Sequence, residues 1–217
     1  MGIGIGLGLS PVIDGGAAMA YPNGVPLTGA AGSYIRCPDA AELDLTGDLD
    51  VVCRLSAADW TPAARRFVAA KWGSSSITWA FTLEPAGTVA LFLSTNGTAA
   101  ASTLTSDDPT GFTDGTVGWL RFTRAQAAGT VRFFKAADQA AVPSSWTQLG
   151  ADETGTTSAL HVGTSPVSFG ATGSGGSGIA GSFYRLIVAG AATVADFNSE
   201  LSGPTGYTDA YGNVWTI

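Results

Sequence analysis

Short runs rich in β-branched and aromatic residues alternate with turn clusters from Gly32 to the end of this 217-residue chain. No segment of helical length sustains an apolar period of 3.6 residues, and one or two helical turns are the most expected in "TPAARRF" and "TVADFNSEL". About a dozen strands at this spacing predict an all-β fold, an antiparallel sandwich of two sheets. The apolar runs include "SYIRC", "LDVVCRL", "RFVAAKWG", "SALHVGT", "VSFGA" and "IAGSFYRLIVAG".

Two stretches carry hairpin signals. "SITWAFTLEPAGTVALFLSTNGTAAASTLT" predicts three strands joined by turns at "PAG" and "TNG", because Asn and Gly both tolerate a positive φ. "TVGWLRFTRAQAAGTVRFFKAAD" predicts a further hairpin around "QAAG". A long loop is expected in "VPSSWTQLGADETG".

Residues 1–31 differ from the rest of the chain in composition and pattern. In the opening "MGIGIGLGLSP" apolar residues alternate strictly with glycine, and an extended chain would place all the aliphatic side chains on one face. Glycine on the other face allows a second backbone to approach closely. We therefore predict a docking arm followed by a Gly/Pro-rich linker, with the sandwich at residues 32–217; the alternative is an unattached N-terminal tail. The residues assigned to docking are Ile3, Gly4, Ile5, Gly6, Leu7 and Leu9.

The charge pattern disfavours several partners. Ten Lys and Arg against 17 Asp and Glu give a formal net charge of −7, with no basic patch of the kind that nucleic acid or an anionic membrane requires. The N-terminus has no Lys or Arg before Arg36, and glycine interrupts its apolar run. We therefore expect neither a signal peptide nor a transmembrane segment.

The two cysteines, Cys37 and Cys53, form no CxxC pair and have no histidine cluster beside them, so no zinc site is predicted. Both fall in strand-like runs. Two buried thiols are the favoured interpretation. A disulfide between neighbouring strands is the alternative.

The order of the segments over residues 32–217 resembles the concanavalin A-like, or laminin-G-like, jelly rolls of phage minor tail and other virion proteins, especially of phages that infect actinobacteria. The resemblance implies a jelly roll of two antiparallel sheets, a structural role in the virion, and binding to glycans or to the host surface. The segments that carry it are "GSYIRCPDAAELDLTGDLDVVCRL", "DWTPAARRFVAAKWG", "WAFTLEPAGTVALFLSTNG", "FTDGTVGWLRFTRA", "WTQLG", "GSFYRLIVAG" and "TDAYGNVWTI".

Carboxylates and the single histidine do not form a catalytic pattern. Glucanases with a similar fold resemble one another in a strand motif E-x-D-x-x-E, which places an acid and a nucleophile on one face. No strand here carries it, and Glu42 and Asp44 precede a turn, which favours solvated turn carboxylates. His161 is interpreted as a strand histidine with a structural hydrogen bond. We expect no enzyme, no catalytic residue and no cofactor.

Two further groups are candidate binding residues. Asp107, Asp108 and Asp114 in "SDDPTGFTDG" offer oxygen ligands for calcium, but ordinary turn sequences are the favoured explanation, and no metal site is predicted. Trp60 and Trp146 lie in loops, where an exposed ring would stack on a sugar and a buried ring would plug the end of the sandwich; tryptophans at similar places in the resembling domains favour packing. The other tryptophans are assigned to the core, namely Trp72, Trp79, Trp119 and Trp215.

The leading functional hypothesis is a non-enzymatic virion protein of the minor tail or tail tip. Residues 1–31 would anchor it to other virion proteins or to sister subunits, and the jelly roll would face outward toward host-surface glycans. A head decoration protein and a free carbohydrate-binding lectin are the alternatives.

Overall fold

The computed structural model describes residues 23–74, 76–203 and 205–217. The docking residues assigned from the sequence, at positions 3–7 and 9, lie outside this part of the chain, as do the other residues before position 23.

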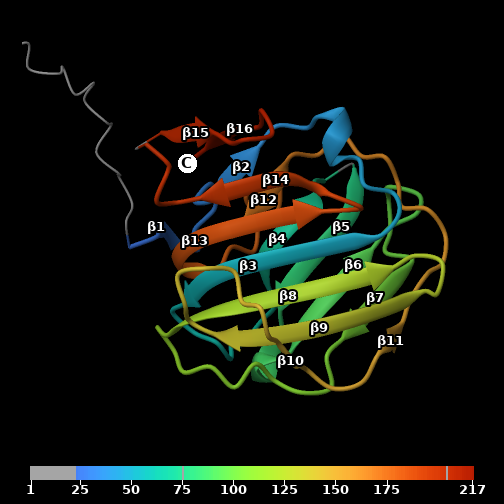
Figure 1. Ribbon diagram of the computed structural model, residues 1–217, viewed down its shortest axis with the longest axis horizontal. Helices are drawn as coiled ribbons and strands as arrows, with labels where there is room; N and C mark the ends of the chain where they lie inside the picture. The colour runs from blue at the N-terminus through green and yellow to red at the C-terminus, as the bar shows by residue number, and fades with distance from the viewer. Residues whose placement is uncertain (1–22, 75, 204) are drawn as a thin grey trace, which may run out of the picture.

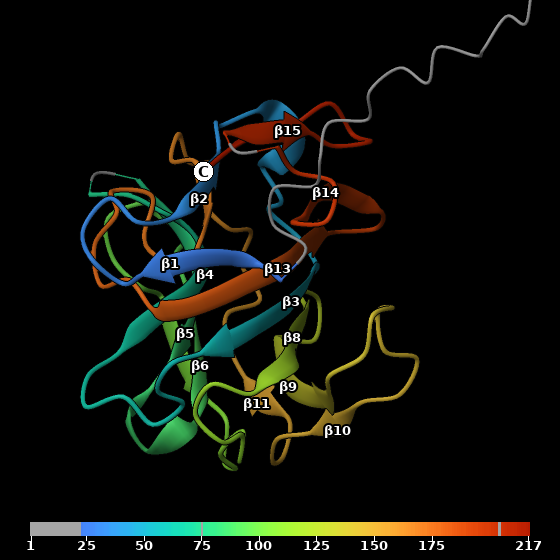
Figure 2. The same cartoon turned by 90° about the vertical axis from the view of Figure 1, so that its left-hand side faces the viewer.

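Two eight-stranded antiparallel sheets pack face to face and confirm the predicted all-β jelly-roll sandwich (Figures 1 and 2). Sheet A has the order β1-β13-β3-β8-β9-β10, with β14 paired to β13 and β11 paired to β9. Its strands are β1 (Val25–Thr28), β3 (Leu49–Ala57), β8 (Val117–Ala125), β9 (Thr130–Ala137), β10 (Thr147–Gln148), β11 (Glu153–Thr154), β13 (Ala180–Ala189) and β14 (Thr193–Asn198).

Sheet B has the order β15-β16-β2-β12-β4-β5-β6-β7. Its strands are β2 (Ile35–Cys37), β4 (Arg66–Trp72), β5 (Ile77–Leu83), β6 (Val89–Leu93), β7 (Ser102–Thr105), β12 (Val167–Phe169), β15 (Gly206–Thr208) and β16 (Val214–Thr216). Two short 3₁₀ turns, η1 (Ala41–Leu43) and η2 (Pro85–Gly87), lie in the connections.

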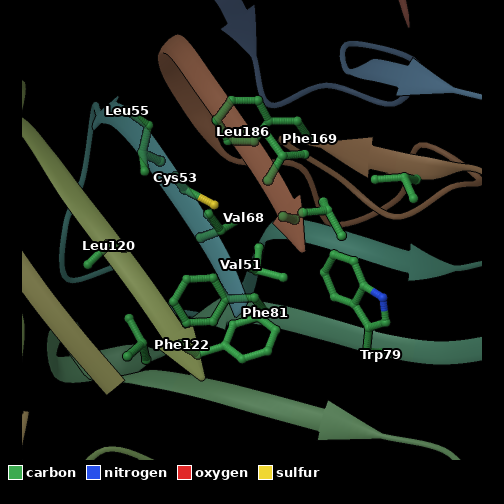
Figure 3. Close-up of a cluster of buried hydrophobic side chains, with 14 of the residues drawn as sticks. Val51, Cys53, Leu55, Val68, Trp79, Phe81, Leu120, Phe122, Phe169 and Leu186 are labelled. Carbon is green, nitrogen blue, oxygen red and sulfur yellow. The ribbon is translucent and has the colours of Figure 1, made fainter. Parts of the chain in front are cut away.

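The core lies between the sheets, because alternate residues of each strand face inward. In β3 the inward residues are Val51, Cys53 and Leu55, all fully buried. They meet side chains from sheet B such as Val68 and Phe81, as Figure 3 shows. This alternation sends the intervening residues of β3 to the outer face of sheet A, where the candidate site lies.

The predicted hairpins are confirmed. β5, β6 and β7 follow one another as neighbours in sheet B, with η2 at "PAG" and a longer loop containing "TNG". β8 and β9 pair around "QAAG", and Gly129 takes the left-handed conformation there, with φ at 64°.

Three local predictions are wrong. The long loop expected in "VPSSWTQLGADETG" contains two short strands, β10 and β11, which both pair with β9. "TVADFN" forms strand β14 and not helical turns, because pairing with β13 buries Ala195 and Phe197. "SALHVGT" forms no strand. The Leu160 amide donates to the carbonyl of Thr46 and the His161 amide to that of Ser94, so successive residues bond to different segments and no ladder develops.

Sheet A begins upstream of Gly32, inside the segment that the sequence assigns to a linker. β1 pairs with the start of β13, Val25 opposite Phe183. Val25 and Leu27 are only 1% and 6% exposed. An apolar residue at every second position of "VPLT" is a strand pattern, although four residues flanked by Gly and Pro give a weak signal.

The tryptophans assigned to the core occupy three kinds of place. Trp79 and Trp215 lie in the core between the sheets, as predicted. Trp119 is fully buried, but it lies on the outer face of sheet A, where its indole N–H donates to the carbonyl of Gln139 at 3.0 Å. The core assignment is wrong for Trp72, which is half-buried and packs edge-on against Phe92, outside the main core.

Both cysteines are free and buried, which confirms the two buried thiols. Burial is the main cause that raises the pKa of Cys37 to about 12. Burial also raises the pKa of Cys53. Thiols in this state are poor nucleophiles and behave as small apolar side chains.

Asp209 fastens the C-terminal hairpin of β15 and β16 to the rest of the sandwich. Its carboxylate accepts hydrogen bonds from the backbone amide of Asp196 at 2.9 Å, the indole of Trp215 at 3.0 Å and the backbone amide of Asn213 at 2.9 Å. Burial raises the pKa of Asp209, but these hydrogen bonds to the ionised form outweigh burial, and the net shift is downward.

We predict that Leu27→Ala lowers the free energy of unfolding by about 2–4 kcal/mol, because it leaves a cavity in the core beneath β1. Pro26→Ala on the exposed face of the same strand is the control and should change stability by less than about 1 kcal/mol. Urea denaturation followed by circular dichroism measures both. Equal, small effects would show that β1 contributes nothing to the folded domain.

We predict that Asp209→Asn costs about 1–3 kcal/mol of stability at neutral pH, because a carboxylate with several donors is lost. The folded-state pKa of Asp209 lies below its ordinary value of 3.8, so its contribution is complete above that pH and is lost as the pH falls through the folded-state value. The stability difference between wild type and variant, from denaturation at a series of pH values, should therefore shrink in acid. A difference independent of pH would contradict this role.

Candidate functional site

Trp146 stands between two hollows on the outer face of sheet A. It lies at the end of the loop 138–146, directly before β10, and its side chain is half-buried. The hollows measure about 400 Å³ and about 250 Å³. The larger one is lined by Lys135, Asp138, Gln139, Ser145, Trp146 and Thr147 among others, and the smaller one by Asp50, Val52, Arg121, Val142, Trp146 and Ile187 among others. We call these residues together the Trp146 surface.

Arg121 is held in a fixed position beneath Trp146. Its guanidinium carbon lies 5.5 Å from the centre of the Trp146 ring and 5.7 Å from that of Phe134. Asp50 binds it with two parallel contacts, Nε to Oδ1 at 2.8 Å and Nη2 to Oδ2 at 2.6 Å. A bidentate pair of this kind fixes the plane of the guanidinium as well as its position.

The strand register brings these groups together. Val52 on β3 is directly opposite Arg121 on β8, and Arg121 is opposite Phe134 on β9. All three therefore face outward, on the side opposite the core. Asp50 shares that face of β3 with Val52, two residues away, and reaches Arg121 diagonally.

The loop 138–146 is fastened over the sheet at its first residues. Arg54 Nε donates to Asp138 Oδ1 at 2.8 Å, and the guanidinium of Arg54 lies 4.7 Å from the ring of Tyr184. The indole N–H of Trp119 binds the next residue, Gln139, through its carbonyl. The position of Trp146 is therefore set from both sides, by the contacts of Asp138 and Gln139 at the start of the loop and by β10 directly after it.

An aromatic face flanked by fixed polar groups suits a ligand with both an apolar face and hydroxyls. Trp offers such a face and a polar edge. Asp50, Asp138 and Gln139 supply acceptors, while Lys135 adds an ammonium that donates to the Thr110 carbonyl at 2.5 Å. Convergent polar groups around an apolar wall are the usual composition of a small-ligand site.

The structure gives Trp60 a packing position. It is fully buried, its indole N–H donates to the carbonyl of Thr116 at 3.1 Å, and its ring lies 4.9 Å from that of Phe112. Since no part of the ring reaches the surface, the interpretation of Trp60 as a sugar contact is wrong and the end-plugging alternative holds.

The three aspartates considered for calcium do not converge. Asp107 accepts from the backbone amide of Ala151 at 2.9 Å, and Asp114 accepts from that of Trp60 at 2.8 Å. Asp108 accepts the hydroxyl of Ser106 through its backbone carbonyl at 2.8 Å. Within residues 23–74, 76–203 and 205–217, no three His, Cys, Asp or Glu side chains are arranged to hold a metal ion.

Glu42, Asp44 and His161, the residues considered for catalysis, lie in three different local environments. Glu42 lies in η1, and Asp44 follows η1, where its carboxylate lies 3.3 Å from the buried ammonium of Lys71. Asp44 is therefore no simple solvated turn carboxylate. His161 lies in no strand, so that part of its interpretation is wrong; it is half-buried, and its backbone carbonyl, not its imidazole, accepts the hydroxyl of Thr78 at 3.1 Å.

Comparison with solved structures places the fold among jelly-roll domains that include binding modules. The CBM40 domain of the Ruminococcus gnavus IT-sialidase matches with a TM-score of 0.52 and 15% identity, over 76% of this chain and 88% of that one. A heptameric SAP-like pentraxin from Limulus polyphemus matches with a TM-score of 0.51 and 14% identity, over 75% and 73% of the two chains.

A bacteriophage protein has the same fold in part of its chain. Tailspike protein 2 of the Escherichia coli O157:H7 bacteriophage CAB120 matches with a TM-score of 0.50 and 17% identity, over 76% of this chain but only 22% of the tailspike. No protein-family model matches the sequence, and no curated protein does. In the part of the chain that the structure describes, no helix is long and apolar enough to cross a membrane.

Proposed function

We propose that this chain is a carbohydrate-binding jelly-roll domain of a phage virion protein, and that the Trp146 surface binds the glycan. The observation that carries the proposal is the half-buried ring of Trp146, stacked on an Arg121 that Asp50 holds in place and flanked by a hollow on each side. A sugar ring would lie on the free face of the indole, with its hydroxyls directed to the polar groups of both hollows.

Two further lines support the virion context. The order of motifs over residues 32–217 resembles that of phage minor tail proteins, and a phage tailspike contains a domain of similar fold. We therefore favour a minor tail or tail-tip location over head decoration or a free lectin. In this proposal residues 1–31 contact other virion proteins or sister subunits, and the jelly roll meets glycans on the host surface.

Weak binding at each copy is expected from such a site. Both hollows are open to solvent, so a sugar would keep part of its surface in contact with water, and the free energy gained at each site would be small. Several copies on one particle would raise the overall avidity by effective concentration, without any additional contact at a single site.

We predict that Trp146→Ala lowers binding to glycans at least tenfold, because stacking on the ring is lost while the folded domain remains. The measurement is a glycan array that includes neutral and acidic sugars and purified host-surface polysaccharide, followed by calorimetry on the strongest hit. Tyr211→Ala is the matched control, since Tyr211 is an exposed aromatic residue, 47% accessible, outside the Trp146 surface. The control should bind like the wild type. The proposal fails if the wild type binds no glycan or if both variants bind equally.

A further inference from the structure

Lys71 is a fully buried lysine that faces the interior of the sandwich. It lies on β4, directly opposite Trp79 of β5 and Val167 of β12, and both of these residues belong to the core. The exposed fraction of its side chain is 0%. An ammonium in such a place is costly unless it is paired with groups that compensate for the lost water.

Two carboxylates reach the amine from one loop. Asp39 and Asp44 flank η1 in the connection between β2 and β3. Asp39 Oδ1 contacts Lys71 Nζ, and Asp44 Oδ1 lies 3.3 Å from the same atom. The exposed fractions of the two carboxylate side chains are 30% and 19%.

Asp44 Oδ1 is buried and accepts no hydrogen bond from the described residues. Buried polar atoms without a partner are rare, and each requires an explanation. Here the oxygen is ion-paired with the Lys71 amine but accepts no hydrogen bond from it, and that amine also contacts Asp39. One nucleophile, one acyl group and one proton acceptor therefore meet in a single cluster, in which the amine is buried and the two carboxylates are partly exposed.

We propose that Lys71 and Asp39 condense to an intramolecular isopeptide bond, with Asp44 as the proton carrier. A proton passes from the ammonium to the Asp39 carboxylate, which leaves an amine beside a carboxylic acid without changing the charge of the cluster. This inference stands apart from the proposed function, because the cluster does not belong to the Trp146 surface.

The reaction balances with the groups present. The Lys71 nitrogen attacks the Asp39 carboxyl carbon, a C–N bond forms, and Asp44 takes a proton from the nitrogen. Asp44 then gives that proton to the departing hydroxyl, the C–O bond breaks, and one water molecule leaves. Proximity replaces external activation of the acid, since the reacting groups are already in contact. The solvent-exposed part of Asp39 gives the water an exit.

The product would join the loop that follows β2 to β4 by a covalent bond. β2 and β4 are not hydrogen-bonded to each other, because β12 lies between them in sheet B. The bond would close a loop of the chain from residue 39 to residue 71. Like a disulfide, a cross-link of this type stabilises a fold mainly by restricting its unfolded state. Unlike a disulfide, it would resist reducing agents.

The test is mass spectrometry of the intact full-length wild type, which should be lighter than its sequence by one water molecule. After trypsin, residues 37–54 and 67–121 should appear as one branched peptide, because acylated Lys71 is not cleaved. A succinimide at an Asp-Gly step such as Asp114–Gly115 also loses water, but it releases peptide 67–71 separately. The proposal is overturned if the folded wild type has its full sequence mass or releases peptide 67–71.

Three variants assign the roles. Lys71→Arg and Asp39→Ala should each retain the full sequence mass. Asp44→Asn keeps both reacting groups and should lose most of the cross-linked product. Glu42→Gln is the matched control, since Glu42 lies in η1 between the two aspartates and is not paired with Lys71; it should cross-link like the wild type. Full cross-linking in Asp44→Asn would refute the role of Asp44, and a wild-type mass that is unchanged refutes the bond regardless of how the variants fold.

Discussion

Packing between the inner faces of the two sheets determines the rest of this structure. Phe81 of sheet B lies with its ring centre 5.1 Å from that of Phe122 and 6.3 Å from that of Phe133, both of sheet A. Because strand residues alternate between faces, fixing Phe122 and Phe133 inward forces Arg121 and Phe134 outward. The geometry of the Trp146 surface is therefore a consequence of the core. If β8 and β9 were shifted by one residue, Arg121 would turn inward and the core residues Phe122 and Phe133 would face solvent.

Local signals in the sequence were sufficient for the fold class but not for the site. Asn-Gly and "QAAG" turns identified hairpins because a turn depends on a few adjacent residues. The local sequence does not identify β14, because "TVADFNSEL" contains residues that also suit a helix and only pairing with β13 makes it a strand. Its loop position makes Trp146 a candidate from the sequence alone, but Asp50 and Arg121 are 71 positions apart, and no spacing rule brings them together. Trp60 shows the same limit, since burial by Phe112 is a tertiary property.

Charged residues make up only 12% of the chain, and many of them form hydrogen bonds or ion pairs between segments that are distant in the sequence. Arg124 is buried on β8. Its guanidinium donates to the carbonyls of Thr156 at 3.2 Å and Ser158 at 2.6 Å in one loop, and to those of Thr46 and Gly47 in another. Asp209 serves the C-terminal hairpin in the same way, with a carboxylate in place of a cation. Hydrogen bonds from such buried charged groups fix the positions of the long loops. Apolar packing between the sheets alone would not determine where these loops lie.

The short pairing of β1 with β13 determines how the domain responds to a pulling force on its N-terminal side. Any pull on the chain ahead of Val25 enters the sandwich through the pairing of β1 with β13, and Pro26 has no amide hydrogen to donate to that pairing. Resistance to such a load therefore depends strongly on the buried side chains of Val25 and Leu27. β13 in turn pairs with β3, the next strand toward the middle of sheet A, so a load applied to β1 is passed to the centre of that sheet.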